Sequence, residues 1–256
     1  DGIRASSVTE FRRVLFRSEE AQKKIIFALD VESMALAEQW AERLAPHVGM
    51  FKIGKQLFTA WGPAVVKAIR DRGGEVFLDL KYHDIPNTVA KASLEAARLG
   101  VRLFNLHALG GYEMMARTME SLSREFPNSF RSRVLAVTIL TSSTADTLHE
   151  VGIDLPVTEM VVRLARLAQK AGIDGVVASP LEIPLIREAC GRDFLIVTPG
   201  VRPAFAAADD QKRVMTPAEA IKAGADYLVI GRPISAAQDP IMAAEMIVEE
   251  IVKAEE

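Results

Sequence analysis

The segment EVFLDLKYHDIPNT, residues 75–88, gives the clearest indication of the fold, because a strand pattern passes directly into charged residues and then into a helix start. Apolar residues dominate its first half, which is typical of a buried strand. Pro86 stiffens the turn that follows, and Thr88 can act as the N-cap of a helix that begins at Val89. The segment therefore predicts one strand–loop–helix unit.

The same unit repeats along the chain from Ile25 onward. Short runs of apolar and β-branched residues are separated by stretches with helical periodicity, which indicates parallel strands joined by crossover helices. The eight strand candidates are IIFALD (25–30), MFKIG (50–54), EVFLDLK (75–81), LFNLHA (103–108), VLAVTIL (134–140), DGVVAS (174–179), FLIVTPG (194–200) and YLVIGR (227–232).

Helix boundaries are marked by residues that commonly begin and end helices. The stretch 216–219, Thr-Pro-Ala-Glu, is a capping box with proline at the first helical position, and Asp239-Pro240 opens the last helix in a similar way. Between residues 157 and 171, apolar residues recur at helical spacing, which predicts a helix packed on the strands. Glycines stand where helices should end, at Gly73, Gly100, Gly172 and Gly224.

These units predict an α/β protein with one domain, a closed (β/α)8 TIM barrel. The chain has 256 residues, close to the usual length of such a barrel. An open doubly wound sheet is the alternative, but no G-x-G-x-x-G turn follows the first strand. We expect the barrel domain to span residues 21–256, and residues 1–20 to be a non-domain N-terminal segment such as an artefact or tag.

Composition and charge argue against several classes of function. The net charge of −3 provides no basic footprint, so we expect no nucleic-acid partner. No apolar stretch reaches the roughly 18 residues of a membrane span, so we expect no membrane partner. The only cysteine, Cys190, rules out an intrachain disulfide and fits a reducing compartment, which predicts a cytoplasmic location.

Charged residues gather toward the ends of the first three strand candidates. Asp30 ends the first, Lys52 lies in the second, and Asp79 and Lys81 end the third. Because side chains alternate faces along a strand, Phe77, Asp79 and Lys81 should share the face that forms the barrel mouth. This rim is where barrel enzymes hold their active sites. A purely stabilising ion-pair network is the alternative, but desolvating several charges seldom improves stability, so a functional role is favoured.

A candidate phosphate site follows the last two strand candidates. TPGVRP (198–203) places Arg202 after the seventh, and Gly231 and Arg232 end the eighth. Loops after strands 7 and 8 commonly form the phosphate site of these barrels, and arginine offers a planar set of donors to phosphate oxygens. A glycine lets backbone amides approach an anion closely.

The sequence resembles the orotidine 5′-phosphate decarboxylase family in its bacterial form, from about Ile25 to Ile251. The segments that carry the resemblance are FKIGKQLF (51–58), FLDLKYHDIPNTV (77–89), LTS (140–142), TPGVRP (198–203), DQKRVMTP (210–217) and YLVIGRPI (227–234). The resemblance implies decarboxylation of orotidine 5′-phosphate to UMP, with no metal and no organic cofactor.

The resemblance also implies roles for individual residues. The catalytic set is Lys52, Asp79, Lys81 and Asp84, with Lys81 as the proton donor. The substrate-binding positions, the last four of them around the phosphate, are Asp30, Lys52, Thr88, Thr141, Arg202, Gln211, Gly231 and Arg232. The family is homodimeric, and its residues that match Asp84 and Thr88 reach into the partner's site.

Two other functions stay open. The first is a related Mg²⁺-dependent decarboxylase or aldolase barrel that acts on sugar phosphates. Such relatives have a similar Asp-x-Lys-x-x-Asp motif, but they generally carry an acidic residue at the position of Lys52. A non-catalytic barrel that binds nucleotide phosphates would account for Arg202 and Arg232, but it gives no reason for alternating lysine and aspartate.

Overall fold

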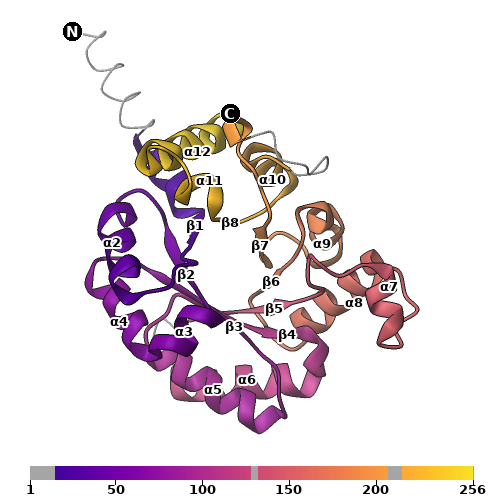
Figure 1. Cartoon of the computed structure of the whole chain (residues 1–256). Coiled ribbons are helices and arrows are strands. Elements are labelled where there is room, and N and C mark those ends of the chain that lie inside the picture. Colours follow the sequence, from indigo (N-terminus) through magenta and orange to yellow (C-terminus); the bar gives the residue numbers. More distant parts are fainter. Residues whose placement is uncertain (1–14, 128–131, 207–214, 256) are drawn as a thin grey trace, which may run out of the picture.

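The computed structural model of the protein describes residues 15–127, 132–206 and 215–255. Within these residues, eight parallel strands close into a barrel in sequence order, with β8 paired to β1 (Figure 1). The strands are β1 (Ile25–Ala28), β2 (Met50–Gly54), β3 (Val76–Tyr82), β4 (Leu103–His107), β5 (Arg133–Val137), β6 (Gly175–Val177), β7 (Leu195–Pro199) and β8 (Tyr227–Ile230). The predicted closed barrel is confirmed.

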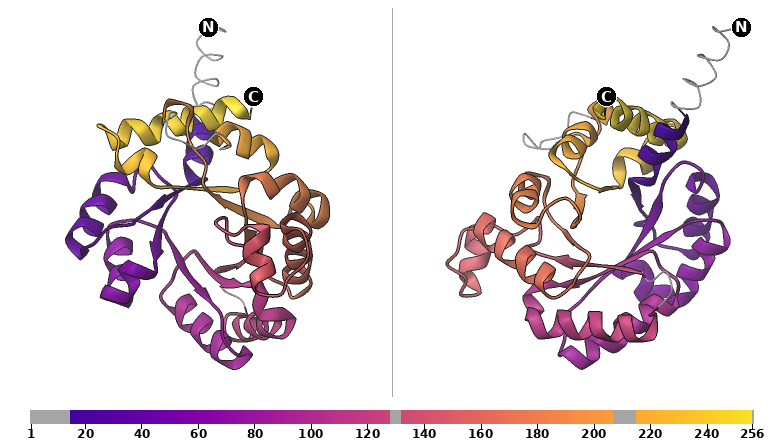
Figure 2. Two further views of the ribbon diagram at one scale, coloured as in Figure 1. Left: turned by 45° about the vertical axis from the view of Figure 1, so that its right-hand side comes forward. Right: turned by 180° about the vertical axis from the view of Figure 1, so that it is seen from behind.

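Helices surround the barrel on its outside (Figures 1 and 2). They are α2 (Met34–Leu44), α3 (Lys55–Trp61), α4 (Pro63–Asp71), α5 (Pro86–Arg98), α6 (Gly111–Glu125), α7 (Ala145–Glu150), α8 (Val157–Lys170), α9 (Ile183–Cys190), α10 (Pro217–Ala223), α11 (Arg232–Ser235) and α12 (Pro240–Ala254). Short 3-10 turns are η1 (Ala108–Gly110), η2 (Pro180–Glu182) and η3 (Ala204–Ala206). None of the helices in the described ranges has the length and apolar character needed to cross a membrane.

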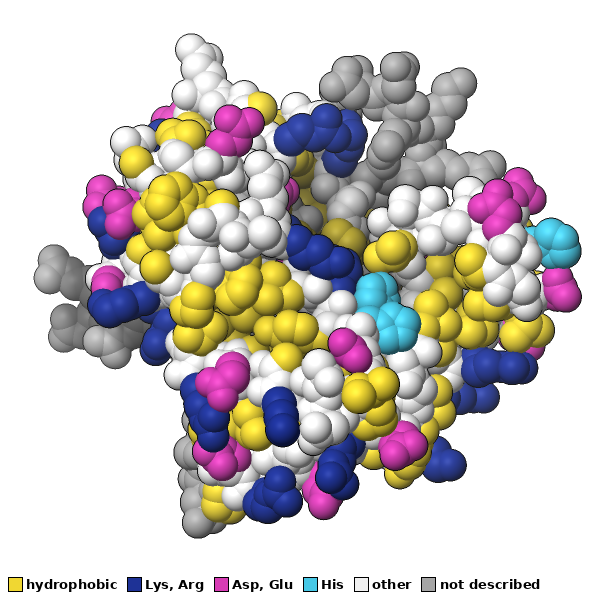
Figure 3. Space-filling model, turned by 60° about the horizontal axis from the view of Figure 1, so that its bottom comes forward, with side chains coloured by type: hydrophobic (Ala, Val, Ile, Leu, Met, Phe, Trp, Pro, Cys, Tyr) yellow, Lys and Arg dark blue, Asp and Glu magenta, His cyan; other side chains and the backbone are white. Residues whose placement is uncertain are grey.

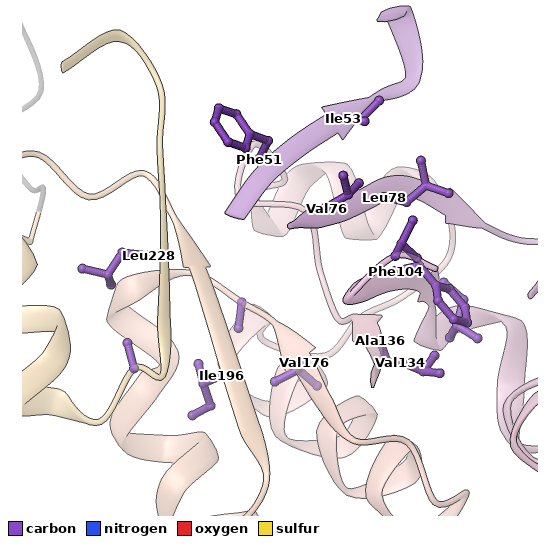
Figure 4. Packing of buried hydrophobic residues seen from close by; sticks show 14 of the residues in the cluster. Phe51, Ile53, Val76, Leu78, Phe104, Val134, Ala136, Val176, Ile196 and Leu228 are labelled. Atoms are coloured by element: carbon purple, nitrogen blue, oxygen red, sulfur yellow. The ribbon is translucent and has the colours of Figure 1, made fainter. Parts of the chain in front are cut away.

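The two faces of the strands are buried in separate apolar layers. The inner layer fills the barrel with side chains from alternating positions: Ile26, Ala28, Met50, Phe77, Leu103, Leu135, Val197 and Val229. The outer layer contacts the helices, and Figure 4 shows part of it, including Phe51, Leu78 and Phe104. Because Phe77 faces inward and Leu78 outward, the predicted faces of the third strand are confirmed up to Asp79.

Most of the predicted helix signals act as expected. Thr216 forms the capping box with Glu219, the Asp239 side chain accepts hydrogen bonds at the start of α12, and Gly224 ends α10 in the left-handed conformation with φ 112°. The N-cap role predicted for Thr88 is wrong. Helix α5 already begins at Pro86, so Ile85 is the N-cap and Thr88 lies inside the first turn.

The N-terminal boundary of the barrel stays a prediction. Residues 15–23 are helical and lead directly into β1, and Ala21 is fully buried. Residues 1–14 lie outside the described residues. The expected division after residue 20 is therefore untested, although residues 15–20 belong to the same helix as Ala21.

Candidate active site

Four charged side chains form a row across the carboxyl ends of β1, β2 and β3. The Lys52 ammonium lies 3.3 Å from Asp30 Oδ1 and 3.6 Å from Asp79 Oδ2. The Lys81 ammonium donates to Asp79 Oδ1 at 2.5 Å. The sequence thus placed Asp30, Lys52, Asp79 and Lys81 at one rim, and the structure brings them into a row of alternating charge.

Asp79 occupies the centre of this row and is the most constrained of the four groups. Its side chain and that of Lys52 are both only 13% exposed. Burial by itself would raise the pKa of Asp79, but the Lys52 and Lys81 ammonium groups and two hydrogen bonds outweigh it and hold that pKa below its usual value. Asp79 is therefore a carboxylate near neutral pH.

The backbone at Lys81 departs from ideal strand geometry. Lys81 has φ 54°, and it is the one non-glycine residue with positive φ among those described. The pairing register between β3 and β4 shifts between Leu78 and Tyr82, so Lys81 falls within an irregularity of the ladder. The simple alternation that was predicted to place Lys81 beside Asp79 therefore ends before Lys81, and the side chain reaches Asp79 from a left-handed backbone.

Asn105 on β4 belongs to the site although the sequence analysis did not select it. It is fully buried, donates through Nδ2 to Asp79 Oδ1 at 2.7 Å, and accepts from the Lys81 backbone N–H at 2.8 Å. Its signal in the sequence is weak but present, because a polar side chain at that position shares the inward face with Leu103.

Two cavities adjoin the charged row, and both are lined by Lys52, Asp79 and Lys81. One, of about 220 Å³, also contacts Asp30 and the start of α3. The other, of about 270 Å³, is mainly apolar and is lined further by Phe77, Val137, Ile139, Leu140, Thr141, Ser142, Val177, Ala178, Pro199 and Val229. The predicted binding residue Thr141 thus reaches the site at the second cavity.

Two histidines lie next to the row, and neither was predicted to act in the site. The ring centroids of His83 and His107 are 5.5 Å apart. Burial, the neighbouring His83 and the ammonium groups of Lys55 and Lys81 lower the pKa of His107 to about 4. His107 is therefore an uncharged polar group near neutral pH.

The other described site residues form no hydrogen bond or ion pair with the charged row in this single chain. Asp84 and Thr88 are exposed, and the Asp84 carboxylate accepts from the Ile85 backbone N–H at 2.6 Å. Arg202 follows β7, and the exposed Arg232 opens α11 after Gly231. Within the described part of the chain, neither arginine is paired with a carboxylate. Gln211 lies outside the described residues.

The donor set at the rim differs from that of a metal centre. Across residues 15–127, 132–206 and 215–255, no three histidine, cysteine or carboxylate groups are grouped so that they could hold a metal ion. A Mg²⁺ site is built from oxygen ligands, whereas two ammonium groups flank the buried carboxylate here.

Fold and rim together define a class of protein, the (β/α)8-barrel enzymes that work with charged side chains at the carboxyl ends of their strands. Comparison with known proteins narrows the class to one family. The profile of the "Orotidine 5'-phosphate decarboxylase / HUMPS family" matches residues 23–247. The chain therefore belongs to this family.

Curated relatives agree over nearly the full length of both chains. The chain is 75% identical to the orotidine 5′-phosphate decarboxylase of Geotalea daltonii and 74% identical to that of Geobacter sulfurreducens. Each alignment spans 234 residues, which is 91% of this chain and 98% of the relative. Among solved structures, the orotidine 5′-phosphate decarboxylase of Lactobacillus acidophilus is 40% identical with a TM-score of 0.78, covering 89% of this chain and 98% of that one.

Proposed function

We propose that this protein decarboxylates orotidine 5′-phosphate to UMP with its own side chains, using Lys81 as the proton donor. The observation that carries the proposal is the buried Asp79 carboxylate between two lysine ammonium groups, beside an apolar cavity at the barrel mouth. Family membership and the names of the close relatives support the substrate.

The chemistry explains why such a row is useful. Loss of CO₂ leaves negative charge on C6 of the pyrimidine, where no adjacent carbonyl delocalises it well. An ammonium group near C6 stabilises that charge and then donates a proton to it. Lys81 suits this task, because its contact with Asp79 holds its ammonium at the edge of the apolar cavity.

The neighbouring residues have distinct proposed roles. Asp79 lies where it would repel the substrate carboxylate and favour its departure, while Lys52 keeps Asp79 ionised and links it to Asp30. The ribose would bind toward Asp30 and Lys52, and the pyrimidine toward Thr141.

A separate set of residues is proposed to bind the phosphate at the ends of β7 and β8. Arg202 and Arg232 supply charge, Gly231 supplies a close backbone, and Gln211 completes the set. Binding energy from this remote group can order the reacting end of the substrate.

We also propose that two chains form a homodimer in which Asp84 and Thr88 reach the partner's site. In the single chain both residues are exposed, and Ile85 between them is 66% exposed. A groove of about 610 Å³ adjoins them, lined by Ile85, Pro86, Asn87, Tyr112, Glu113, Ala116, Arg117 and Glu120. Figure 3 turns the α5 and α6 side of the molecule forward and shows hydrophobic side chains gathered on it.

A cytoplasmic location is proposed on a separate ground, because Cys190 is buried and unpaired.

An absorbance assay tests the function directly. Purified protein should convert orotidine 5′-phosphate to UMP at an unchanged rate in EDTA, and the loss of the orotate chromophore can be followed in the ultraviolet. Activity that disappears with EDTA and returns with Mg²⁺ would instead favour the sugar-phosphate relatives. Binding of UMP without any turnover would favour a non-catalytic nucleotide-binding barrel.

A further inference from the structure

Asn105 connects the two central groups of the charged row through one planar side chain. Its Nδ2 donates to Asp79 Oδ1 at 2.7 Å, the same oxygen that accepts from the Lys81 ammonium. Its Oδ1 accepts from the Lys81 backbone N–H at 2.8 Å. The partners dictate this orientation, because a carboxylate can only accept and a backbone N–H can only donate.

The backbone of Lys81 needs such a partner. Its φ of 54° lies in the left-handed region, which a side chain with a Cβ seldom adopts, and the β3–β4 ladder is irregular at this point. The Lys81 N–H would otherwise lose its place in the ladder, and an unpaired backbone donor in a partly buried site is unfavourable. The Asn105 side chain, fully buried on β4, supplies the missing acceptor.

The same side chain also fixes the orientation of the Asp79 carboxylate. With Oδ1 held by Asn105 and the Lys81 ammonium, Oδ2 is the oxygen that faces Lys52 at 3.6 Å. Rotation of the carboxylate would break three contacts together. Asn105 thus holds both Lys81, the proposed acid, and the Asp79 carboxylate. Asn105 itself lines neither of the two cavities next to the charged row.

We propose that Asn105 is a positioning residue of the decarboxylase site, which holds the Lys81 backbone in its left-handed conformation and sets the orientation of Asp79. This inference rests on the proposed function. Asn105 acts through Asp79 and Lys81 and is expected to contribute little to the binding of the ribose or phosphate.

Two variants separate the two halves of this role. Asn105→Ala removes both hydrogen bonds. Asn105→Asp keeps an acceptor for the Lys81 N–H, but it loses the donor to Asp79 and places a second carboxylate beside it. Thr118→Val on α6 is the matched control, because it removes a different buried hydrogen bond, from the Thr118 hydroxyl to the Met114 carbonyl.

The expected kinetic result is a loss in kcat with little change in ligand affinity. Asn105→Ala should lower kcat by about 10²-fold, the size typical of a misplaced catalytic group, while the Kd for UMP from calorimetry changes less than about threefold. For Asn105→Asp, the acid limb of the pH profile should move to higher pH, because a like charge raises the pKa of the neighbouring carboxyl. Thr118→Val should keep the kcat and pH profile of the unmodified protein.

A titration without substrate tests the same inference independently of turnover. Carbon-13 NMR of the Asp79 carboxyl should show a higher pKa in both Asn105 variants than in the unmodified protein. If the unmodified protein does not decarboxylate orotidine 5′-phosphate, the proposed function fails, and the titration still decides whether Asn105 sets the state of Asp79. An unchanged Asp79 titration, or an Asn105→Ala protein with normal kcat, would overturn the proposal. A loss of kcat and UMP affinity in equal proportion would do so as well.

Discussion

Asp79 keeps its charge at the barrel mouth because opposite charges compensate for its burial. At about 4 Å and an effective dielectric near 20, one such contact contributes on the order of 4 kcal/mol before desolvation is counted. Desolvation costs several kcal/mol per ion, so the row adds little net stability. Deleting a single charged side chain of the row should nevertheless destabilise the protein, because the oppositely charged partner stays buried without compensation. This asymmetry makes substitutions at Lys81 informative about both chemistry and folding.

Lys81→Ala should abolish most of the activity while leaving phosphate binding intact. The loss of a general acid alone typically lowers the rate by about 10²–10⁴-fold, and the loss here should exceed that because the ammonium also stabilises the carbanion. The Kd for UMP should change far less, since Arg202 follows β7 and Arg232 opens α11 after β8. Kinetics and calorimetry on the variant measure both quantities. Lys67→Ala, which removes an exposed lysine of α4, is the control and should retain normal activity; comparable activity in the two variants would rule out Lys81 as the acid.

His107 should make the folded protein less stable in mild acid. Its pKa is lowered to about 4 by burial and by nearby His83, Lys55 and Lys81, whereas an unfolded histidine titrates near 6.5. Between about pH 6.5 and 4 the unfolded chain therefore binds a proton that the folded chain does not, and stability falls as the pH falls. Because the ring is only half-buried, the loss should be on the order of 1 kcal/mol.

Urea unfolding at pH 7 and pH 5 measures this effect. His107→Gln should reduce the difference between the two pH values, because the half-buried imidazole is then absent. An identical pH dependence in His107→Gln would show that other groups are responsible.

The sequence predicted which segments are strands, and hence where the site lies, more reliably than it predicted where each element begins and ends. All eight strand candidates are strands, but most are shorter than expected, as in β6, which covers only Gly175–Val177 of the predicted 174–179. Their residue types specify a buried strand, whereas the last paired residue depends on the neighbouring strand. The wrong N-cap at Thr88 has a local cause, since Pro86 can itself occupy the first helical position and the helix starts there.

The ends of β7 and β8 should recognise the phosphate and not the nucleoside. Arg232→Ala should weaken UMP binding by roughly 1.5–3 kcal/mol, the usual contribution of a hydrogen bond to a charged group, and should barely affect uridine binding. Calorimetry with both ligands tests this, and Arg163→Ala, on an exposed part of α8, is the control. Equal losses for UMP and uridine would contradict a phosphate site at this rim.

At the scale of the whole molecule, one chain is proposed to contain an incomplete site. The charged row is assembled within the chain, whereas Asp84 and Thr88 lie exposed beside the groove at α5 and α6. A two-fold dimer makes both sites equivalent, since each chain lends the same residues to its partner. A shared site of this kind can be tested by mixing two inactive variants, because activity would not return if each chain contained its whole site.

Mixed dimers should recover activity from two inactive proteins. When Lys81→Ala and Asp84→Ala chains exchange subunits, one site of each hybrid carries both lesions and the other carries none. Activity should therefore return to at most about half of the normal value per hybrid dimer. Native mass spectrometry verifies the exchange, and two Lys81→Ala preparations mixed together are the control. Confirmed exchange without recovered activity would show that the sites are not shared.

The barrel and the location of its charged rim could both be predicted from the amino-acid sequence. Both follow from local rules, because strand periodicity assigns each side chain to a face and parallel strands carry their carboxyl ends to the same side. Asp30, Lys52 and Asp79 could be placed in this way from their own strands alone. Their motifs also carried the family resemblance that the comparisons confirm.

The conformation of Lys81 and the contacts that hold it follow from the pairing of β3 with β4 and could not be predicted from the sequence. Its left-handed backbone, the shifted register of β3 against β4 and the contacts of Asn105 all depend on pairing between residues 24 to 26 positions apart in the chain. The closeness of His83 and His107, and with it the low pKa of His107, has the same origin. A period of two in the sequence describes one strand, but the register between two strands is set by packing and hydrogen bonding across the ladder.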